Sequence, residues 1–312
     1  MKHLLLSILT LTLLFSSCKK EELELPVIPE TPETVEISEQ GSNDETARNE
    51  YDQSIENAFK ALESTNFGSR GADSGVILPC GVISIDTTGG KHKIVYGKNC
   101  NRKVLSGTIV ATLMPPFKKW REKGAVIHLE YQNYTVLFEV NNQTLVFNGT
   151  IVVTNINGGQ VYEAITLKNT IAHKIRGSIN ITFDNGKTRT WQIFKRRTYS
   201  AANGKIENLE AQLAADSTGN IAEVGITKSG ENFTTTVPTA FRYMNCGQSS
   251  EVGPFVLVNG KLVFTVGLNS VTAEAGQKFE SGVFTAVNDC SAVGYKLTWN
   301  VAGVIKEEFQ YY

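Results

Sequence analysis

The sequence predicts an all-β body made of antiparallel hairpins and preceded by one amphipathic helix. From Val76 onward, β-branched and aromatic residues alternate with polar ones, as in "INITF" (179–183) and "LVFTV" (262–266), which is the period of strands with one buried face. Four turn signals each lie between two such runs: Asn185-Gly186, Asn203-Gly204, Asn259-Gly260 and Ala302-Gly303. Asn-Gly pairs favour tight hairpins because both residues tolerate positive φ. No second capped helical pattern follows residue 66. The body is long enough for one curved antiparallel sheet or for two stacked β subdomains.

The N-terminus has the pattern of an export signal. An apolar run of 12 residues (4–15) follows Lys2, and it is well short of the ~20 residues that a membrane-spanning helix needs. Small Ser16 and Ser17 then precede Cys18, as in bacterial lipoprotein signals, in which the cysteine thiol is acylated and becomes the new N-terminus. We therefore predict lipidation at Cys18. The alternative is a cleaved secretory protein in which this cysteine occurs by chance.

Residues 19–42 read as an extended acidic spacer. They contain seven Glu and three Pro. The segment has too little apolar surface to fold, and its prolines keep it extended. Charge divides the mature chain: residues 19–67 hold four Lys/Arg against 13 Asp/Glu, a net charge of −9, and residues 68–312 hold 25 against 18, a net charge of +7. The basic residues of the body are scattered through Thr- and Asn-rich segments, so we expect no nucleic-acid partner.

A helix is predicted over residues 43–64. Ser42 and Glu45 form a capping-box pattern, and four apolar residues then recur at spacings of four, four and three: Tyr51, Ile55, Phe59 and Leu62. The apolar stripe is expected to pack on the β body, and the alternative is a partner-binding helix.

A weak internal repeat indicates where the body divides. Cys80 opens a segment that runs through a hairpin signal to "IVYGKNC", and Cys246 opens another that runs through Asn259-Gly260 to "FTAVNDC". Two copies of one unit suggest a boundary near residues 199–204. The expected organisation is a signal peptide (1–17), a lipidated acidic tether (18–42), an amphipathic helix (43–66), β subdomain 1 (67–199) and β subdomain 2 (200–312).

Four cysteines follow Cys18, and an even number in an exported chain favours disulfides. Zinc is the competing interpretation, but the chain has no CxxC pair and its four histidines are isolated in sequence. If "TTGG" (87–90) is a hairpin turn, Cys80 lies opposite Asn99 or Cys100, close to bridging distance. We predict Cys80–Cys100 and, by analogy through the repeat, a second bridge between Cys246 and Cys290. Free buried thiols are the remaining alternative.

Catalytic motifs are missing from the sequence: we find no nucleophile elbow, zinc-protease helix, phosphate loop or paired Cys-His signature. No catalytic residue, metal ligand or cofactor is therefore predicted. A carboxylate pair for glycoside cleavage can be imagined, but only a spatial separation would test it. The carboxylates considered, with solvated surface residues as the alternative, are Glu130, Glu139, Glu207 and Glu210.

The densest unusual cluster is "PPFKKWREK" (115–123), in which aromatic and cationic residues alternate. Such a loop could stack on sugar rings or hold an anionic polymer. The candidate ligand contacts are Phe117, Lys118, Lys119, Trp120 and Arg121. In the alternative interpretation Trp120 folds back onto the sheet and the charges face water, and we interpret "FKRRTY" (194–199) in the same way.

These features together resemble a family. The signal that ends at Cys18, the "KKEE" after it, and "HKIVYGKNCNRKVLSGTIVATL" (92–113) are similar to uncharacterised surface lipoproteins of Bacteroidetes, and "KKEE" resembles the surface-export signal of that phylum. The resemblance covers most of the chain after residue 76. It implies an all-β body on the outer membrane, exposed at the cell surface, and it implies no catalysis.

The expected function is a non-enzymatic surface lipoprotein. Its partners would be the membrane, through the lipid anchor, and an unidentified glycan or protein that the β body binds or displays. One rival is an enzyme that acts on envelope or host glycans. The other is a structural component of an envelope complex, with sheet edges or the helix as its docking surface.

Overall fold

The computed structural model describes residues 47–48, 50–55, 57–59, 78–88, 91–100, 102–117, 119–227, 229–247 and 255–311. The signal peptide, Cys18, the tether, Leu62 and Lys118 lie outside the described residues.

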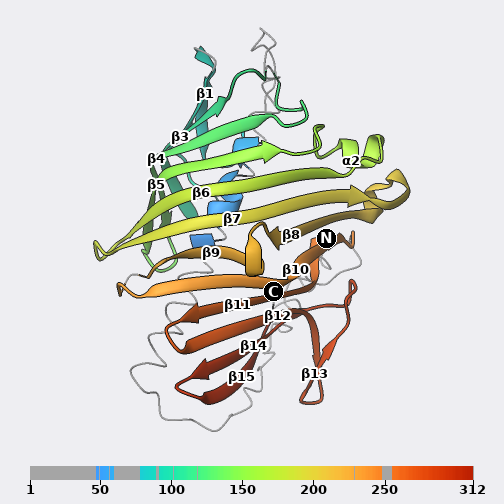
Figure 1. Cartoon of the computed structure of the whole chain (residues 1–312). Coiled ribbons are helices and arrows are strands. Elements are labelled where there is room, and N and C mark those ends of the chain that lie inside the picture. The colour runs from blue at the N-terminus through green and yellow to red at the C-terminus, as the bar shows by residue number, and fades with distance from the viewer. Residues whose placement is uncertain are drawn as a thin grey trace, which may run out of the picture.

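Fifteen strands of the described part form one antiparallel sheet (Figure 1). They are β1 (Val82–Asp86), β2 (Lys91–Tyr96), β3 (Lys103–Leu113), β4 (Val126–Phe138), β5 (Thr144–Asn155), β6 (Ile171–Phe183), β7 (Thr188–Ala201), β8 (Leu209–Ala215), β9 (Ile221–Ile226), β10 (Asn232–Asn245), β11 (Phe255–Val266), β12 (Asn269–Glu280), β13 (Val283–Ala286), β14 (Gly294–Val301) and β15 (Val304–Tyr311). A short helix, α2 (Glu163–Thr166), joins β5 to β6. The all-β prediction is confirmed.

The strands follow one another in sequence order with two exceptions. β8 and β9 both pair with β7 on one side and with β10 on the other, so they lie end to end in one place in the sheet. β13 pairs with the far end of β12, from Gln277 to Glu280, and Gln277 also pairs with Gly294 of β14. The other neighbours are consecutive antiparallel strands, in agreement with the prediction of antiparallel hairpins.

One face of the sheet is covered by a helix that includes residues 47–48, 50–55 and 57–59, here called the inner helix. Figure 1 shows it in blue behind the sheet. Its Tyr51, Ile55 and Phe59 are buried in a single core with residues from β1 through β7, β10 and β11. The prediction that the apolar stripe packs on the body is confirmed for these three residues. The face that meets the inner helix is called the inner face below.

Tight backbone contacts bend the sheet around the inner helix. The pairing of β3 with β4 shifts register between Ser106 and Thr108, as at a β-bulge. Gly107 lies there at φ +88°, and a Cβ at this position would come within 2.0 Å of the Asn133 carbonyl oxygen. On β5, a Cβ at Gly149 would come within 2.3 Å of the Ser178 carbonyl oxygen. Only glycine allows strands to approach so closely at a bend.

The turn predictions had mixed outcomes. Asn185-Gly186 joins β6 to β7, and Ala302-Gly303 joins β14 to β15, as expected. Asn203-Gly204 lies in a 3-10 turn (Ala202–Gly204) of the longer connection from β7 to β8, so it does not form a tight hairpin. The prediction for Asn259-Gly260 was wrong, because both residues lie inside β11. Gly260 has φ +147° there and lets the ring of Phe241 approach, while the pairing of β10 with β11 shifts register nearby. The pair therefore forms a bulge within a strand. A glycine inside a strand often marks such a bulge, because the absence of a side chain lets another group approach the backbone closely.

The sheet is continuous across the boundary expected near residue 199. That boundary falls inside β7, where Tyr199 pairs with Ile171 of β6 and with Ala211 of β8. Of the two alternatives, the strands therefore form one curved sheet and not two stacked ones. Smaller apolar clusters of the C-terminal half, around Val271 and around Val256, stand apart from the main core. The division at residue 199 stays a prediction about folding units.

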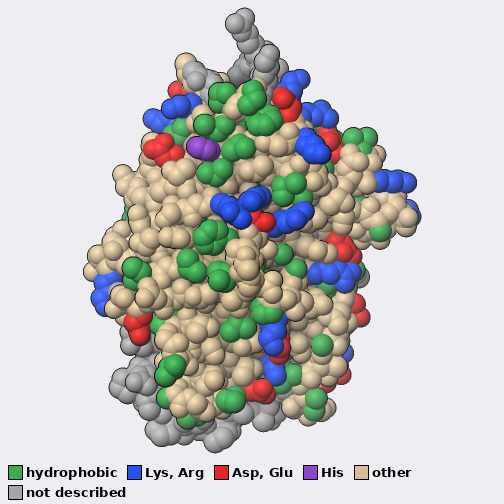
Figure 2. All heavy atoms as spheres, viewed as in Figure 1, with side chains coloured by type: hydrophobic (Ala, Val, Ile, Leu, Met, Phe, Trp, Pro, Cys, Tyr) green, Lys and Arg blue, Asp and Glu red, His purple; other side chains and the backbone are tan. Residues whose placement is uncertain are grey.

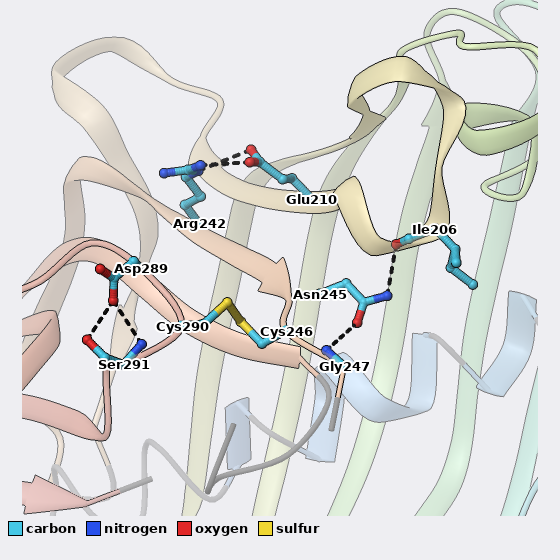
Figure 3. Close-up of a disulfide and its surroundings, with 9 residues drawn as sticks. All are labelled: Ile206, Glu210, Arg242, Asn245, Cys246, Gly247, Asp289, Cys290 and Ser291. Atoms are coloured by element: carbon cyan, nitrogen blue, oxygen red, sulfur yellow. Dashed lines mark hydrogen bonds and ion pairs between the residues drawn. A yellow bond between two sulfur atoms is a disulfide. The ribbon is translucent and has the colours of Figure 1, made fainter. Parts of the chain in front are cut away.

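Both predicted disulfides are formed. Cys80 and Cys100 flank the β1–β2 hairpin with a Cα separation of 5.4 Å. Cys246 and Cys290 connect the end of β10 to the segment between β13 and β14, with a Cα separation of 5.6 Å (Figure 3). In each case the bridge fixes the end of a strand pair, where the hydrogen-bonded ladder stops.

Removing either disulfide is expected to destabilise the body. In the chain-entropy model, closing 20 residues contributes about 3 kcal/mol and closing 44 residues about 4 kcal/mol. A Cys246→Ser/Cys290→Ser variant should therefore lose more stability in urea unfolding than Cys80→Ser/Cys100→Ser. Equal stability of both variants and the native chain would contradict a bracing role.

Candidate functional site

The loop predicted to contact a ligand places its tryptophan in the core. Trp120 is buried and stacks on Phe59 of the inner helix, with ring centroids 5.3 Å apart and an interplanar angle of 15°. His173 of β6 lies against the same indole ring at a centroid distance of 5.1 Å. This is the alternative interpretation, in which Trp120 folds back onto the sheet. Its ring offers no free face to a sugar in this conformation.

The other residues of the loop have separate environments. Phe117 is partly buried against the core. Arg121 donates to Glu163 of α2 at 2.6 Å, and the backbone N–H of Lys119 donates to the Glu122 carboxylate at 2.7 Å. These contacts explain the positions of Phe117, Trp120 and Arg121, whereas the Lys119 side chain is exposed. The ligand role of this loop stays a prediction.

The densest polar arrangement lies at the interface between the inner helix and the sheet. We call it the ionic cluster, and its members are Arg48 and Asp52 of the inner helix, Lys195 and Arg197 of β7, and Glu223 of β9. Arg48 donates to both oxygens of Glu223, at 3.1 and 2.9 Å. The ammonium of Lys195 lies 2.7 Å from Glu223 and 3.9 Å from Asp52, and Arg197 donates to Asp52 at 2.7 Å. Five charged residues thus form one connected network.

Strand alternation directs these cations inward. Every second residue of β7, from Arg189 through Trp191, Ile193 and Lys195 to Arg197, is buried. The interpretation of "FKRRTY" as a segment whose charges all face water was therefore wrong for Lys195 and Arg197. Only Arg196 of the three cations in it is exposed.

Aromatic rings surround the buried cations. The ammonium of Lys195 lies 5.4 Å from the ring centroid of Tyr51 and 5.7 Å from that of Trp191. The guanidinium of Arg189 lies 4.3 Å from the ring centroid of Phe233 and 5.1 Å from that of Trp191. Such contacts replace part of the hydration that a buried cation loses.

Glu223 is ionised in this setting. Its side chain is 1% exposed, and burial alone would raise its pKa, but the charges of Arg48 and Lys195 and their hydrogen bonds hold the pKa well below the usual range. A general acid needs the opposite shift, toward a raised pKa. The site therefore suits electrostatic fastening and not proton donation.

Two further polar contacts fasten the same helix. Lys103 of β3 forms an ion pair with Glu50, and the hydroxyl groups of Ser54 and Tyr131 lie 2.8 Å apart in a buried hydrogen bond. The polar contacts of the inner helix thus reach β3, β4, β7 and β9, on both sides of the sheet's bend.

His173 is the other buried titratable group of note. Its ring contacts Phe59, Trp120 and Tyr199, and neither ring nitrogen has a hydrogen-bond partner within the described structure. Burial, with a smaller effect from Arg197, lowers its pKa to about 3. The imidazole is therefore neutral at ordinary pH and packs as an aromatic ring.

Glu130 and Glu139 are too far apart to form a pair for glycoside cleavage. Glu130 and Glu139 are nine positions apart along β4 and the turn after it, on the order of 25–30 Å for extended chain. An inverting pair needs roughly 6.5–9.5 Å. Glu210 accepts from Arg242 at 2.7 and 3.1 Å, and Glu207 lies 3.5 Å from Lys205. All four behave as surface carboxylates, most with a local partner.

The outer face of the sheet carries charges of both signs. Figure 2 shows Lys/Arg and Asp/Glu side chains interspersed over it, with uncharged surface between them. On this face the Asp216 carboxylate forms ion pairs with the Arg176 guanidinium at 2.9 Å and with the Lys174 ammonium at 3.3 Å. Within the described residues no group of three or more His, Cys, Asp or Glu side chains could hold a metal ion. Nor does any described helix have the length and hydropathy to cross a membrane.

Sequence reasoning missed the ionic cluster, although one signal pointed to it. In "RTWQIFKRR" the apolar Trp191 and Ile193 share a strand parity with Arg189, Lys195 and Arg197. If the tryptophan faces the core, the three cations face it too. No comparable signal marked Glu223, because β9 is short and Arg48, its ion-pair partner on the inner helix, is 175 residues away in sequence.

Removing the Glu223 carboxylate should strongly destabilise the fold. Glu223→Gln leaves Lys195 and Arg48 with an uncompensated buried charge, which typically costs about 3–5 kcal/mol. The control is Glu207→Gln, which removes an exposed ion pair and should change stability by less than about 0.5 kcal/mol. Urea unfolding of both variants measures the difference, and equal effects would contradict the role of the cluster.

The cluster also predicts a dependence on pH. Because the pKa of Glu223 is lowered in the folded state, its contribution is complete above the ordinary Glu pKa of about 4.3 and is lost as pH falls toward the folded pKa. Between about pH 4 and pH 2, the native chain should lose up to about 1.4 kcal/mol per pH unit more than Glu223→Gln. Parallel pH profiles of unfolding free energy would overturn this assignment.

Comparison with protein-family models, with curated proteins and with solved structures gives no match to this chain.

Proposed function

We propose that the chain is a lipid-anchored outer-membrane lipoprotein, exposed at the cell surface, whose β body binds or displays a partner without catalysing a reaction. The proposal is supported at the N-terminus by the short apolar run, the small residues before Cys18 and the "KKEE" that follows. The acidic, proline-containing spacer then separates the anchor from the body.

The observation that carries the proposal is how the inner helix is held. It is the first described element after the tether, and it is fixed in the sheet by the ionic cluster, by Lys103–Glu50 and by Ser54–Tyr131. Any load on the anchor reaches the body through this helix. A helix held by polar contacts at four positions from Arg48 to Ser54 gives the body a fixed element at its tethered end.

The same contacts favour binding or display over the rival enzyme. The buried carboxylate with a lowered pKa is engaged by Arg48 and Lys195. Of the carboxylates first considered, Glu210 is paired with Arg242 and Glu207 with Lys205. A structural component of an envelope complex would have the same anchor and the same body, and only its partner would differ from that of the proposed function.

Replacing the predicted acylated cysteine tests the anchor. Cys18→Ser removes the predicted site of acylation and should abolish incorporation of labelled palmitate. Without its acyl chains the protein should leave the membrane fraction. Ser16→Ala, which keeps the cysteine, is the matched control. Membrane association of Cys18→Ser equal to that of the control would refute lipid anchoring.

Protease treatment of intact cells tests the side of the membrane. The native body should be degraded, whereas a variant with alanine at all four positions 19–22 should be protected and still carry palmitate. Protection of the native body would place it on the inner leaflet.

A further inference from the structure

The two edges of the sheet differ in their readiness to pair with another strand. β1 is short, and its register with β2 shifts between Val82 and Ser84, which disrupts an edge. β15 is longer and pairs with β14 in unbroken register from Val304 to Tyr311. Among the described residues, β14 is its one neighbouring strand. Its apolar side chains are open to solvent, with Val304 57% and Ile305 65% exposed.

The β14–β15 turn fixes which backbone groups point away from the sheet. Ala302 and Gly303 have φ of 50° and 83°, as in a two-residue type I′ hairpin. In such a hairpin the closing pair, Val301 and Val304, exchanges both hydrogen bonds, and bonded and non-bonded pairs then alternate. Ile305 and Glu307 therefore direct their N–H and C=O groups away from β14.

The charge pattern of β15 complements itself in one antiparallel arrangement. When two copies of the strand pair about Glu307, Lys306 of each copy lies opposite Glu308 of the other, and Ile305 lies opposite Phe309. Cross-strand pairs of opposite charge and of apolar side chains both stabilise a sheet. The two neighbouring registers place Lys306 opposite itself or Glu308 opposite itself, which is unfavourable.

The carboxylate at the centre of this arrangement already has a counter-ion. Lys296 of β14 donates to Glu307 at 3.0 Å, and its ammonium also lies 3.8 Å from Glu274 of β12. In the paired arrangement the two Glu307 carboxylates would lie opposite each other, and Lys296 of each copy would offset their repulsion.

We propose that β15 is an interaction surface for a second copy of this chain, with the two strands antiparallel and centred on Glu307 so that two sheets become one. The partner is a second copy because Lys306 and Glu308 of one β15 are complementary in charge to Glu308 and Lys306 of another. This inference does not depend on the lipid anchor.

A cysteine at the two-fold position tests the contact directly. In a hydrogen-bonded antiparallel pair the Cα atoms are about 5.5 Å apart, within the range that a disulfide bridges. The full chain with Cys18→Ser and Glu307→Cys should form a covalent dimer under mild oxidation. The control is Val140→Cys in the same background, since Val140 is 77% exposed in the β4–β5 turn. Dimer yields no higher than in the control would overturn the proposal.

Charge exchange then tests the register. Lys306→Glu places like charges opposite each other at both symmetric positions and should weaken dimerisation roughly tenfold in analytical ultracentrifugation. Glu308→Lys should do the same, and the double variant Lys306→Glu/Glu308→Lys should restore association. Circular dichroism and thermal unfolding confirm that each variant is folded. Single variants that dimerise like the native chain, or a double variant that stays weak, would reject this register.

Discussion

The structure depends on covering the inner face of one wide antiparallel sheet. Each strand presents apolar side chains to one side, and an uncovered face of that size would be exposed to water. The inner helix supplies the cover, with Tyr51, Ile55 and Phe59 entering the main core. The sheet bends to meet it where glycines such as Gly107 and Gly149 allow strands to approach closely. Helix and bend are therefore two parts of one packing solution.

The ionic cluster gives this packing a defined position. Buried ion pairs add little net stability against an apolar replacement, but they penalise arrangements that separate the charges. Arg48 and Asp52 are one helical turn apart and carry opposite charges, and each meets its opposite on the sheet. Moving the helix by one turn would bring Asp52 toward Glu223. The network thus selects one seating of a helix that apolar contacts alone would hold less specifically.

This arrangement bears on how the protein would work at a membrane. The ionic cluster holds the inner helix, while the outer face presents mixed charges and the described part of the sheet ends at β15. A body of this kind offers surfaces and edges to partners. An anchored chain that pairs through its edge would gain from confinement to a membrane, because tethering raises the effective concentration of one copy near another.

The sequence by itself determined most of the strands, the inner helix and the Cys80–Cys100 pair, because alternation, helical spacing and hairpin turns are local signals. The Cys246–Cys290 pair was predicted only by analogy, and its bridge encloses β11, β12 and β13 instead of one hairpin. Tertiary structure decided what depends on neighbours distant in the chain. Trp120 is buried because Phe59 covers it, and Lys195 faces inward because Glu223 neutralises it there. Asn259-Gly260 became a bulge because β11 pairs with β10 across it. Period two divides a strand into two faces, but only packing determines which face is buried and with which charges.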